Sequence, residues 1–99
     1  MTPYTEAKFK TGKLIATAGI ANFINQIAWN HIWVDECLQR HKAGDWGDLE
    51  QEDKEANDQA LEYGDRLFSS YITDEGGTKI WIITDADRLH TNISFPHEY

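Results

Sequence analysis

Along the chain, the apolar and polar positions follow a strand-like period, then a helical period, and then a strand-like period again. Residues 8–19 alternate cations with apolar residues and pass through Leu14-Ile15-Ala16, which predicts an edge strand. From about Ala21 this alternation gives way to steps of three and four, through Ile20, Phe23, Ile24, Ile27, His31, Val34 and Leu38. That spacing predicts one long amphipathic helix, with cations in its last turn and Gly44 just past its C-terminal cap.

A second helix is predicted in the polar segment that ends at Gly64. Residues 45–47 form a tight connection, after which Asp48 is expected to cap the helix and Gln51 to answer it, as in a capping box. The helix should run from about Leu49 to Tyr63. Most of its circumference is expected to face water, because its apolar stripe is limited to Leu49, Ala56, Ala60 and Tyr63.

Three strands are predicted after Gly64. The runs "RLFSSYIT" and "TKIWIIT" flank the turn-forming "DEGG" at residues 74–77 and indicate a hairpin. The second run has no polar face, so we expect a central strand covered on both sides, or on one side plus a partner. The run "HTNISF" predicts an outer strand that ends at Pro96. Its expected outward residues are His90, Asn92 and Ser94, and its expected inward residues are Thr91, Ile93 and Phe95.

The resulting order, β-α-α-β-β-β, predicts an α+β fold. We expect an antiparallel sheet of three to four strands with two helices packed on one face, and the order leaves open whether the first strand joins the sheet. A chain of 99 residues forms one core, so residues 1–99 are expected to make a single domain. Cys37 is the only cysteine, which excludes an internal disulfide. With no leader and no long apolar run, the sequence predicts a cytoplasmic protein without a membrane segment.

Negative charge is concentrated in the second helix and the turn before it. Residues 44–64 hold eight carboxylates and one cation, Lys54, and so carry seven of the chain's eight net negative charges. One interpretation is a solvated helix that keeps the protein soluble. The other is a rigid surface that imitates a nucleic-acid backbone and binds a basic protein surface, without direct nucleic-acid binding. The predicted partner-binding residues are Asp45, Trp46, Asp48, Glu52, Asp53, Glu55, Asp58 and Glu62.

A second candidate site follows the predicted central strand. Asp85 and Asp87 could share a proton or hold a cation, Arg88 lies beside them, and His90 could act as an acid or a base. The alternative is a simple turn, because aspartate favours turns and Arg88 can neutralise a neighbouring carboxylate. The histidines and Cys37 do not follow a zinc-binding spacing. The sequence therefore predicts no metal site and no cofactor, and an enzyme only as the alternative.

The tryptophans each allow a packing role and a binding role. Trp29 and Trp33 lie four residues apart on a flank of the first helix, where they either widen the core face or anchor a partner. Trp46 lies beside the acidic helix, where it either plugs the corner between the helices or contributes to the partner surface.

Several segments resemble a family of small bacterial proteins carried on plasmids and other mobile elements. The similarity lies in "KFKTGKLIAT", "GDWGDLEQEDKEANDQAL", "GDRLFSSY" and "KIWIITDADRLHTNISFPHEY". These proteins often bear the label "plasmid-related protein" or "type I restriction endonuclease subunit M". The chain lacks the glycine-rich cofactor loop and the Asn-Pro-Pro-aromatic motif of a DNA methyltransferase. The resemblance therefore implies an association with mobile elements and host defence, and it assigns no catalytic residue.

Three functions are compatible with the sequence. The first is a non-enzymatic anti-defence protein, an anti-CRISPR or anti-restriction inhibitor, that occupies a basic nucleic-acid-binding surface of a host nuclease complex. The second is a small nuclease or toxin-like enzyme that uses Asp85, Asp87, Arg88 and His90. The third is a structural or regulatory module that forms a homodimer.

Overall fold

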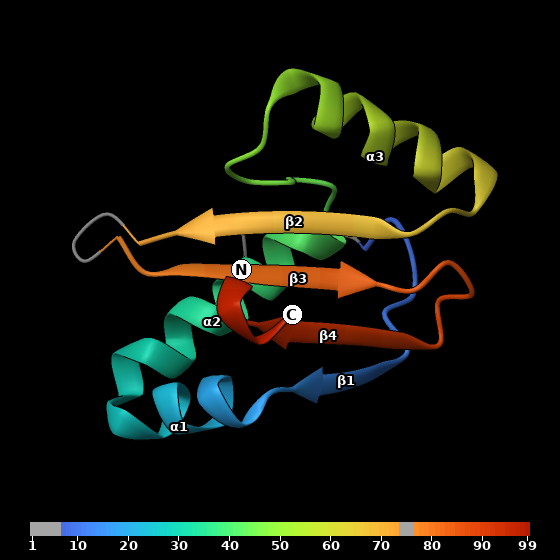
Figure 1. Ribbon diagram of the computed structural model, residues 1–99. Coiled ribbons are helices and arrows are strands. Elements are labelled where there is room, and N and C mark those ends of the chain that lie inside the picture. The colour runs from blue at the N-terminus through green and yellow to red at the C-terminus, as the bar shows by residue number, and fades with distance from the viewer. Residues whose placement is uncertain (1–6, 74–76) are drawn as a thin grey trace.

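The computed structural model describes residues 7–73 and 77–99, which form an α+β fold (Figure 1). The elements in chain order are β1 (Lys13–Ala16), α1 (Ala18–Gln26), α2 (Ala28–Lys42), α3 (Gln51–Tyr63), β2 (Leu67–Ile72), β3 (Lys79–Thr84), β4 (His90–Ser94) and a short 3-10 helix, η1 (Pro96–Glu98). The predicted α+β class is confirmed. The predicted hairpin is β2 and β3, and its expected turn at residues 74–77 lies mostly outside the described residues.

The sheet is mixed, with the strand order β1-β4-β3-β2 (Figure 1). β2, β3 and β4 form the predicted antiparallel meander, in which Ser70 pairs with Trp81 and Ile82 pairs with Ile93. β1 joins the other side of β4 in parallel, so the prediction of a purely antiparallel sheet is wrong. The prediction of β4 as an outer strand is also wrong, because β1 covers its free edge. Thr91 and Ile93 face inward as predicted, but Ser94, expected outward, is buried.

The long helix predicted after β1 is two helices. Ile27 has an extended backbone, with φ −147° and ψ 151°, and it separates α1 from α2. Just beyond this break, the Asn30 side chain donates a hydrogen bond of 2.8 Å to the carbonyl oxygen of Phe23 in the last turns of α1. Asn30 thereby satisfies a helix-end carbonyl that has no partner inside α1. A three- and four-residue period fits both helices, so the period alone could not reveal the break.

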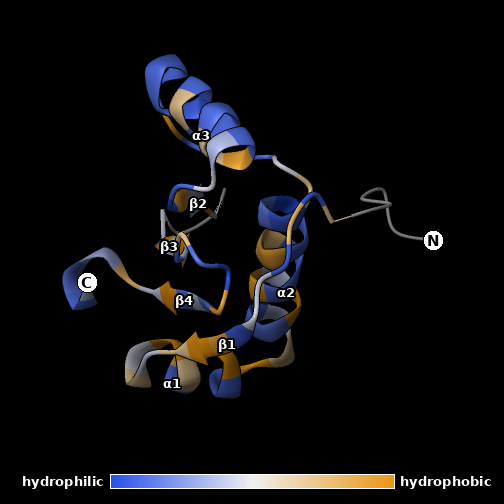
Figure 2. Ribbon diagram, turned by 90° about the vertical axis from the view of Figure 1, so that its right-hand side faces the viewer, coloured by the Kyte–Doolittle hydropathy of each residue, from blue (hydrophilic) through white to orange (hydrophobic). Residues whose placement is uncertain are grey.

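The helices do not share one face of the sheet, as was predicted. α2 covers one face and packs against α1, whereas α3 lies beside the edge strand β2 (Figures 1 and 2). The main core between α2 and the sheet consists of Ile20, Val34, Cys37, Leu38, Tyr71, Ile80, Ile82 and Ile93. A second cluster beneath α3 is built on Trp46, Ala60 and Leu67, with Phe9, Leu49 and Leu61 packed against it. Because this second cluster lies beneath it, α3 packs beside β2 and apart from the layer formed by α1 and α2.

The outer edge of β2 is closed by two different devices. The Asn57 side chain in α3 donates to the carbonyl oxygen of Phe68 at 2.7 Å and accepts from the Phe68 N–H at 3.0 Å. Farther along, the Ser70 N–H donates to Trp46, and the Ser70 carbonyl accepts from the Asp48 N–H. Gly47, at φ +78°, lies against the Ser70 carbonyl, where a Cβ atom would clash. The edge therefore offers few free groups for uncontrolled strand pairing.

Replacing Asn57 by alanine is expected to lower the free energy of unfolding by about 2–3 kcal/mol, because it leaves the Phe68 N–H and carbonyl without partners. Urea unfolding followed by circular dichroism measures this loss. Gln59→Ala on the same helix is the matched control, since Gln59 is exposed and should be nearly neutral. Equal losses in the two variants would show that the Asn57 amide does not hold the edge.

Candidate partner-binding surface

The sequence predicted the C-terminal end of α3 correctly and its N-terminal cap wrongly. Gly64 closes the helix as predicted, at φ +79°, and its N–H donates to the Ala60 carbonyl. The predicted cap at Asp48 is wrong: Glu50 is the N-cap residue, without a side-chain cap bond, and the Asp48 N–H bonds to β2. Because this edge contact needs the Asp48 backbone, the helix begins later, at Gln51.

Trp46 is a core residue beneath α3. Its side chain is only 3% exposed, and its ring packs with those of Phe9 and His41 at centroid distances of 6.3 and 5.8 Å. The indole Nε1–H donates to Asp58 Oδ1 at 3.0 Å. The structure thus places Trp46 in the packing role, as the plug of the helix corner, and places Asp58 as its hydrogen-bond partner.

Asp45 also has an internal partner. Its carboxylate pairs with Arg40 at 2.7 Å and accepts the Gly47 N–H at 3.2 Å. Burial by itself would raise the pKa of Asp45, but the hydrogen bond and charge of Arg40 outweigh it and hold this pKa below its ordinary value. Asp45, Trp46 and Asp58 therefore serve the fold, although Asp58 is exposed and uses only Oδ1 in its bond to Trp46.

The other five predicted binding residues are exposed carboxylates: Asp48, Glu52, Asp53, Glu55 and Glu62. Within residues 7–73 and 77–99, the ion pairs are Arg40–Asp45 and His90–Asp85, so none includes a carboxylate of α3. Figure 2 shows the ribbon of α3 largely in hydrophilic colours, at one end of the sheet. The carboxylates of α3 are therefore solvated and, among the described residues, not ion-paired, with Lys54 as the cation of the helix.

Helix stability explains only part of this charge. Glu52 and Asp53 lie in the first turn, where the helix dipole favours anions. Glu62 lies in the last turn, where the dipole disfavours them, and it is four residues from Asp58, a like-charge spacing that costs about 0.2–0.5 kcal/mol. Glu55 is on the same face as Glu62, nearly two turns away. Glu55 and Glu62 are thus the carboxylates that the fold explains least.

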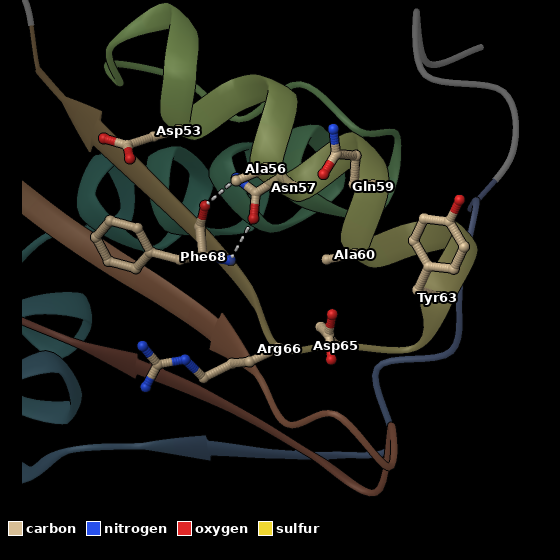
Figure 3. A pocket seen from close by; sticks show the side chains of 9 residues that line it. All are labelled: Asp53, Ala56, Asn57, Gln59, Ala60, Tyr63, Asp65, Arg66 and Phe68. Atoms are coloured by element: carbon tan, nitrogen blue, oxygen red, sulfur yellow. Dashed lines mark hydrogen bonds between the residues drawn. The ribbon is translucent and has the colours of Figure 1, made fainter.

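An open groove runs between α3 and β2, with a volume of about 470 Å³ (Figure 3). Asp53, Ala56 and Tyr63 line it from the helix. Asp65, Arg66 and Phe68 line it from the segment that enters β2. This groove could not be predicted from the sequence, because it depends on α3 lying beside the sheet edge.

The second candidate site, after β3, is a tight turn tied to α3. The Arg88 guanidinium donates to the carbonyl oxygens of Asp65 at 2.7 Å, Asp85 at 3.1 Å and Ala60 at 3.1 Å. Arg88 itself has φ +62°, an uncommon backbone conformation for a residue other than glycine. Its side chain therefore holds the C-terminal end of α3 against the β3–β4 turn.

The acidic members of this turn have local contacts. Asp87 Oδ1 accepts the Leu89 N–H at 2.9 Å, as aspartate does in turns, and Asp85 Oδ2 lies 3.7 Å from Nδ1 of His90. In the part of the chain that the structure describes, no group of three or more His, Cys, Asp or Glu side chains converges as metal ligands would. These contacts agree with the simple turn interpretation.

A buried polar chain in the core was missed by the sequence analysis. His41 is fully buried, and its ring nitrogens lie 2.5 Å from Ser69 Oγ and 2.9 Å from Thr84 Oγ1. Thr84 is bonded in turn to Thr91, at 2.7 Å. Burial, with a smaller contribution from the charge of Arg88, lowers the pKa of His41 to about 3. The sequence feature that could have indicated this chain is a set of hydroxyl residues in the strands, Ser69, Thr84 and Thr91, which are all buried.

The two tryptophans of α2 are divided between packing and exposure. Trp33 is half-buried and meets the Phe23 ring edge-on at 6.2 Å, so it widens the core face. Trp29 is 61% exposed beside the exposed Ile27.

Cys37 is buried, and burial raises the pKa of its thiol to about 12, which makes it unreactive.

Comparison with known proteins found no family model, no curated protein and no solved structure that matches the chain. Among the described helices, none has the length and apolar character needed to cross a membrane.

Proposed function

We propose that this protein is a non-enzymatic inhibitor whose acidic helix α3 occupies a basic nucleic-acid-binding surface of a nuclease complex. The observation that carries the proposal is the exposed set of carboxylates on α3 without an ion pair among the described residues. Such a surface attracts a basic partner over a long range and suits fast, salt-sensitive association.

The anchoring of α3 supports the proposal, because a mimic of nucleic acid must hold its charges in place. Trp46 bonds to Asp58, Asn57 bonds to Phe68, and Arg88 bonds to Ala60. On α3 these contacts use Asp58, Asn57 and Ala60, so they anchor about one turn in the C-terminal half of the helix. A helix anchored in this way loses little conformational freedom on binding, which favours affinity.

The spacing of the charges also supports it. Glu52 to Glu62 spans about 15 Å of helix axis at 1.5 Å per residue, and five carboxylates lie within that length. Duplex DNA carries a charge about every 1.7 Å, so the helix presents more than half of that linear density. The family resemblance, which implies mobile elements and host defence, favours an anti-CRISPR or anti-restriction target.

The proposal is tested by displacement of a fluorescent DNA duplex from purified complexes, using a type I restriction complex and a CRISPR effector complex. The wild-type protein should displace the duplex from at least one of them at low salt, and less so at high salt. Failure with the complexes of its own host would contradict the proposal.

The matched variants are Glu55→Lys with Glu62→Lys on α3, and Asp35→Lys with Glu36→Lys on α2. Both pairs are exposed, and both change the net charge equally. Reversal on α3 should weaken displacement at least about tenfold, and reversal on α2 much less. Equal weakening would show that net charge, rather than the surface of α3, drives the inhibition.

A further inference from the structure

The flank of α3 that faces the groove differs from its fully solvated side. Asn57 and Ala60 are buried against the body of the protein, while Glu55 and Glu62 point to the opposite side of the helix. Ala56 and Tyr63 lie between these two sides, and Asp53 lies one turn before Asn57; all three line the groove (Figure 3). This flank therefore borders an open groove, whereas the opposite side of the helix offers charge alone.

The lining combines apolar surface with carboxylates at both ends. The small side chain of Ala56 lies in the middle, the Phe68 ring lies toward one end, and Tyr63, 73% exposed, presents a second ring at the other. In Figure 3, Asp53 stands near Phe68 at one end of the groove, and Asp65 lies toward Tyr63 at the other. A side chain with an apolar stem and a cationic head fits this lining, because the stem can lie on the apolar surface while the head reaches a carboxylate at one end.

The groove's own cation, Arg66, forms no ion pair with these carboxylates among the described residues. Arg66 donates to the hydroxyl of Tyr99 at 2.7 Å, and thus to the C-terminal end of the described chain. Neither Asp53 nor Asp65 has an ion pair with any residue that the structure describes. Asp53 and Asp65 therefore keep carboxylates that can accept a cation from outside, although the guanidinium groups of Arg66 and Arg88 lie nearby.

We propose that the groove receives an arginine side chain from an arginine-bearing segment of the basic partner. The aliphatic stem lies on Ala56 and Phe68, while the guanidinium pairs with Asp53 or Asp65 and stacks on an aromatic ring. Arginine fits better than lysine because its planar guanidinium both stacks on rings and forms paired hydrogen bonds with carboxylates. The volume of about 470 Å³ is within the range of ligand pockets. This inference rests on the proposed function and names the chemistry of the same partner.

The probe is a blocked Arg-Gly-Arg-Gly-Arg peptide, titrated into ¹⁵N-labelled protein and followed by NMR. The amide signals of Ala56, Tyr63 and Phe68 should shift. The lysine counterpart should bind about three- to tenfold more weakly, and the uncharged citrulline counterpart should not bind. Equal affinity for the arginine and lysine peptides, with shifts centred on Glu55 and Glu62, would overturn the proposal.

Two variants test the groove directly. Ala56→Leu fills it from an exposed helix position, and Asp53→Asn removes one carboxylate without changing size. Each should lower affinity for the arginine peptide at least about threefold. Gln51→Leu on α3 and Glu36→Gln on α2 are the matched controls outside the groove and should bind nearly as the wild type does. Unchanged binding by both groove variants would overturn the proposal.

These outcomes separate the two proposals. If Ala56→Leu still displaces the duplex from the nuclease complex and the Glu55 and Glu62 reversals do not, the proposed function stands and the groove is not the binding site. If the arginine peptide binds in the groove but the wild-type protein displaces no duplex, the groove assignment stands and the nuclease target is wrong.

Discussion

Replacing Trp46 by alanine is expected to lower the free energy of unfolding by about 3–5 kcal/mol, as for other fully buried aromatic side chains. The indole is 3% exposed and forms the centre of the cluster beneath α3. Its removal leaves a cavity and also leaves Asp58 without its hydrogen-bond donor. Because the domain as a whole is expected to have only about 5–15 kcal/mol of stability, this one substitution should remove a large part of it.

The measurement is chemical unfolding followed by circular dichroism, with Trp29→Ala as the control. Trp29 is 61% exposed, so its loss should be small. Trp46→Phe keeps an aromatic ring and loses the indole N–H, and a double-mutant cycle with Asp58→Ala should give a coupling of about 1 kcal/mol. Losses of equal size for Trp46→Ala and Trp29→Ala would contradict the assignment of Trp46 as the plug of this corner.

Acidification from pH 7 to pH 5 is expected to destabilise the protein by about 2 kcal/mol through His41 alone. In the unfolded chain His41 takes up a proton below its ordinary pKa of 6.5, whereas in the folded protein it stays neutral down to a pKa of about 3. Between these values the unfolded state binds more protons than the folded state. The contribution of neutral His41 to the free energy of unfolding is therefore present above pH 6.5 and is lost as the pH falls from 6.5 toward 3.

His41→Gln is expected to be less stable than the wild type at pH 7, but its stability should depend much less on pH between 7 and 5. His31→Gln is the control, because His31 is exposed on α2, and it should keep the wild-type dependence. The carboxyl groups with a shifted pKa, Asp45 and Glu98, titrate below ordinary values of 3.8 and 4.5 and so contribute at lower pH. A His41→Gln variant with an undiminished pH dependence would show that another group titrates in this window.

The location of most helices and strands was predictable because local chemistry determines it. The alternating run at residues 13–16 became β1, and the two apolar runs after Gly64 became the β2–β3 hairpin. Gly44 and Gly64 follow helices in left-handed conformations, where glycine has no Cβ to clash. The α+β class follows from this order of elements.

The arrangement of those elements was less predictable, because it depends on contacts between residues far apart in the chain. β1 pairs in parallel with β4, although nearly eighty residues separate them. The Asp48 N–H bonds to Ser70 rather than opening α3, and Ile27 interrupts a period that continues on both sides of it. At Asp48 a tertiary contact outweighs a local capping preference of about one kcal/mol.

The same division holds for the candidate surface. The sequence by itself determined that residues 44–64 carry most of the net negative charge and that a helix presents it. Only the tertiary structure decided which of these residues are available, because it buries Trp46, bonds Asp58 to it and pairs Asp45 with Arg40. It also placed α3 against β2, and so formed the groove that ends in Asp53 and Asp65. Charge is a property of each residue, whereas exposure depends on its neighbours in the folded chain.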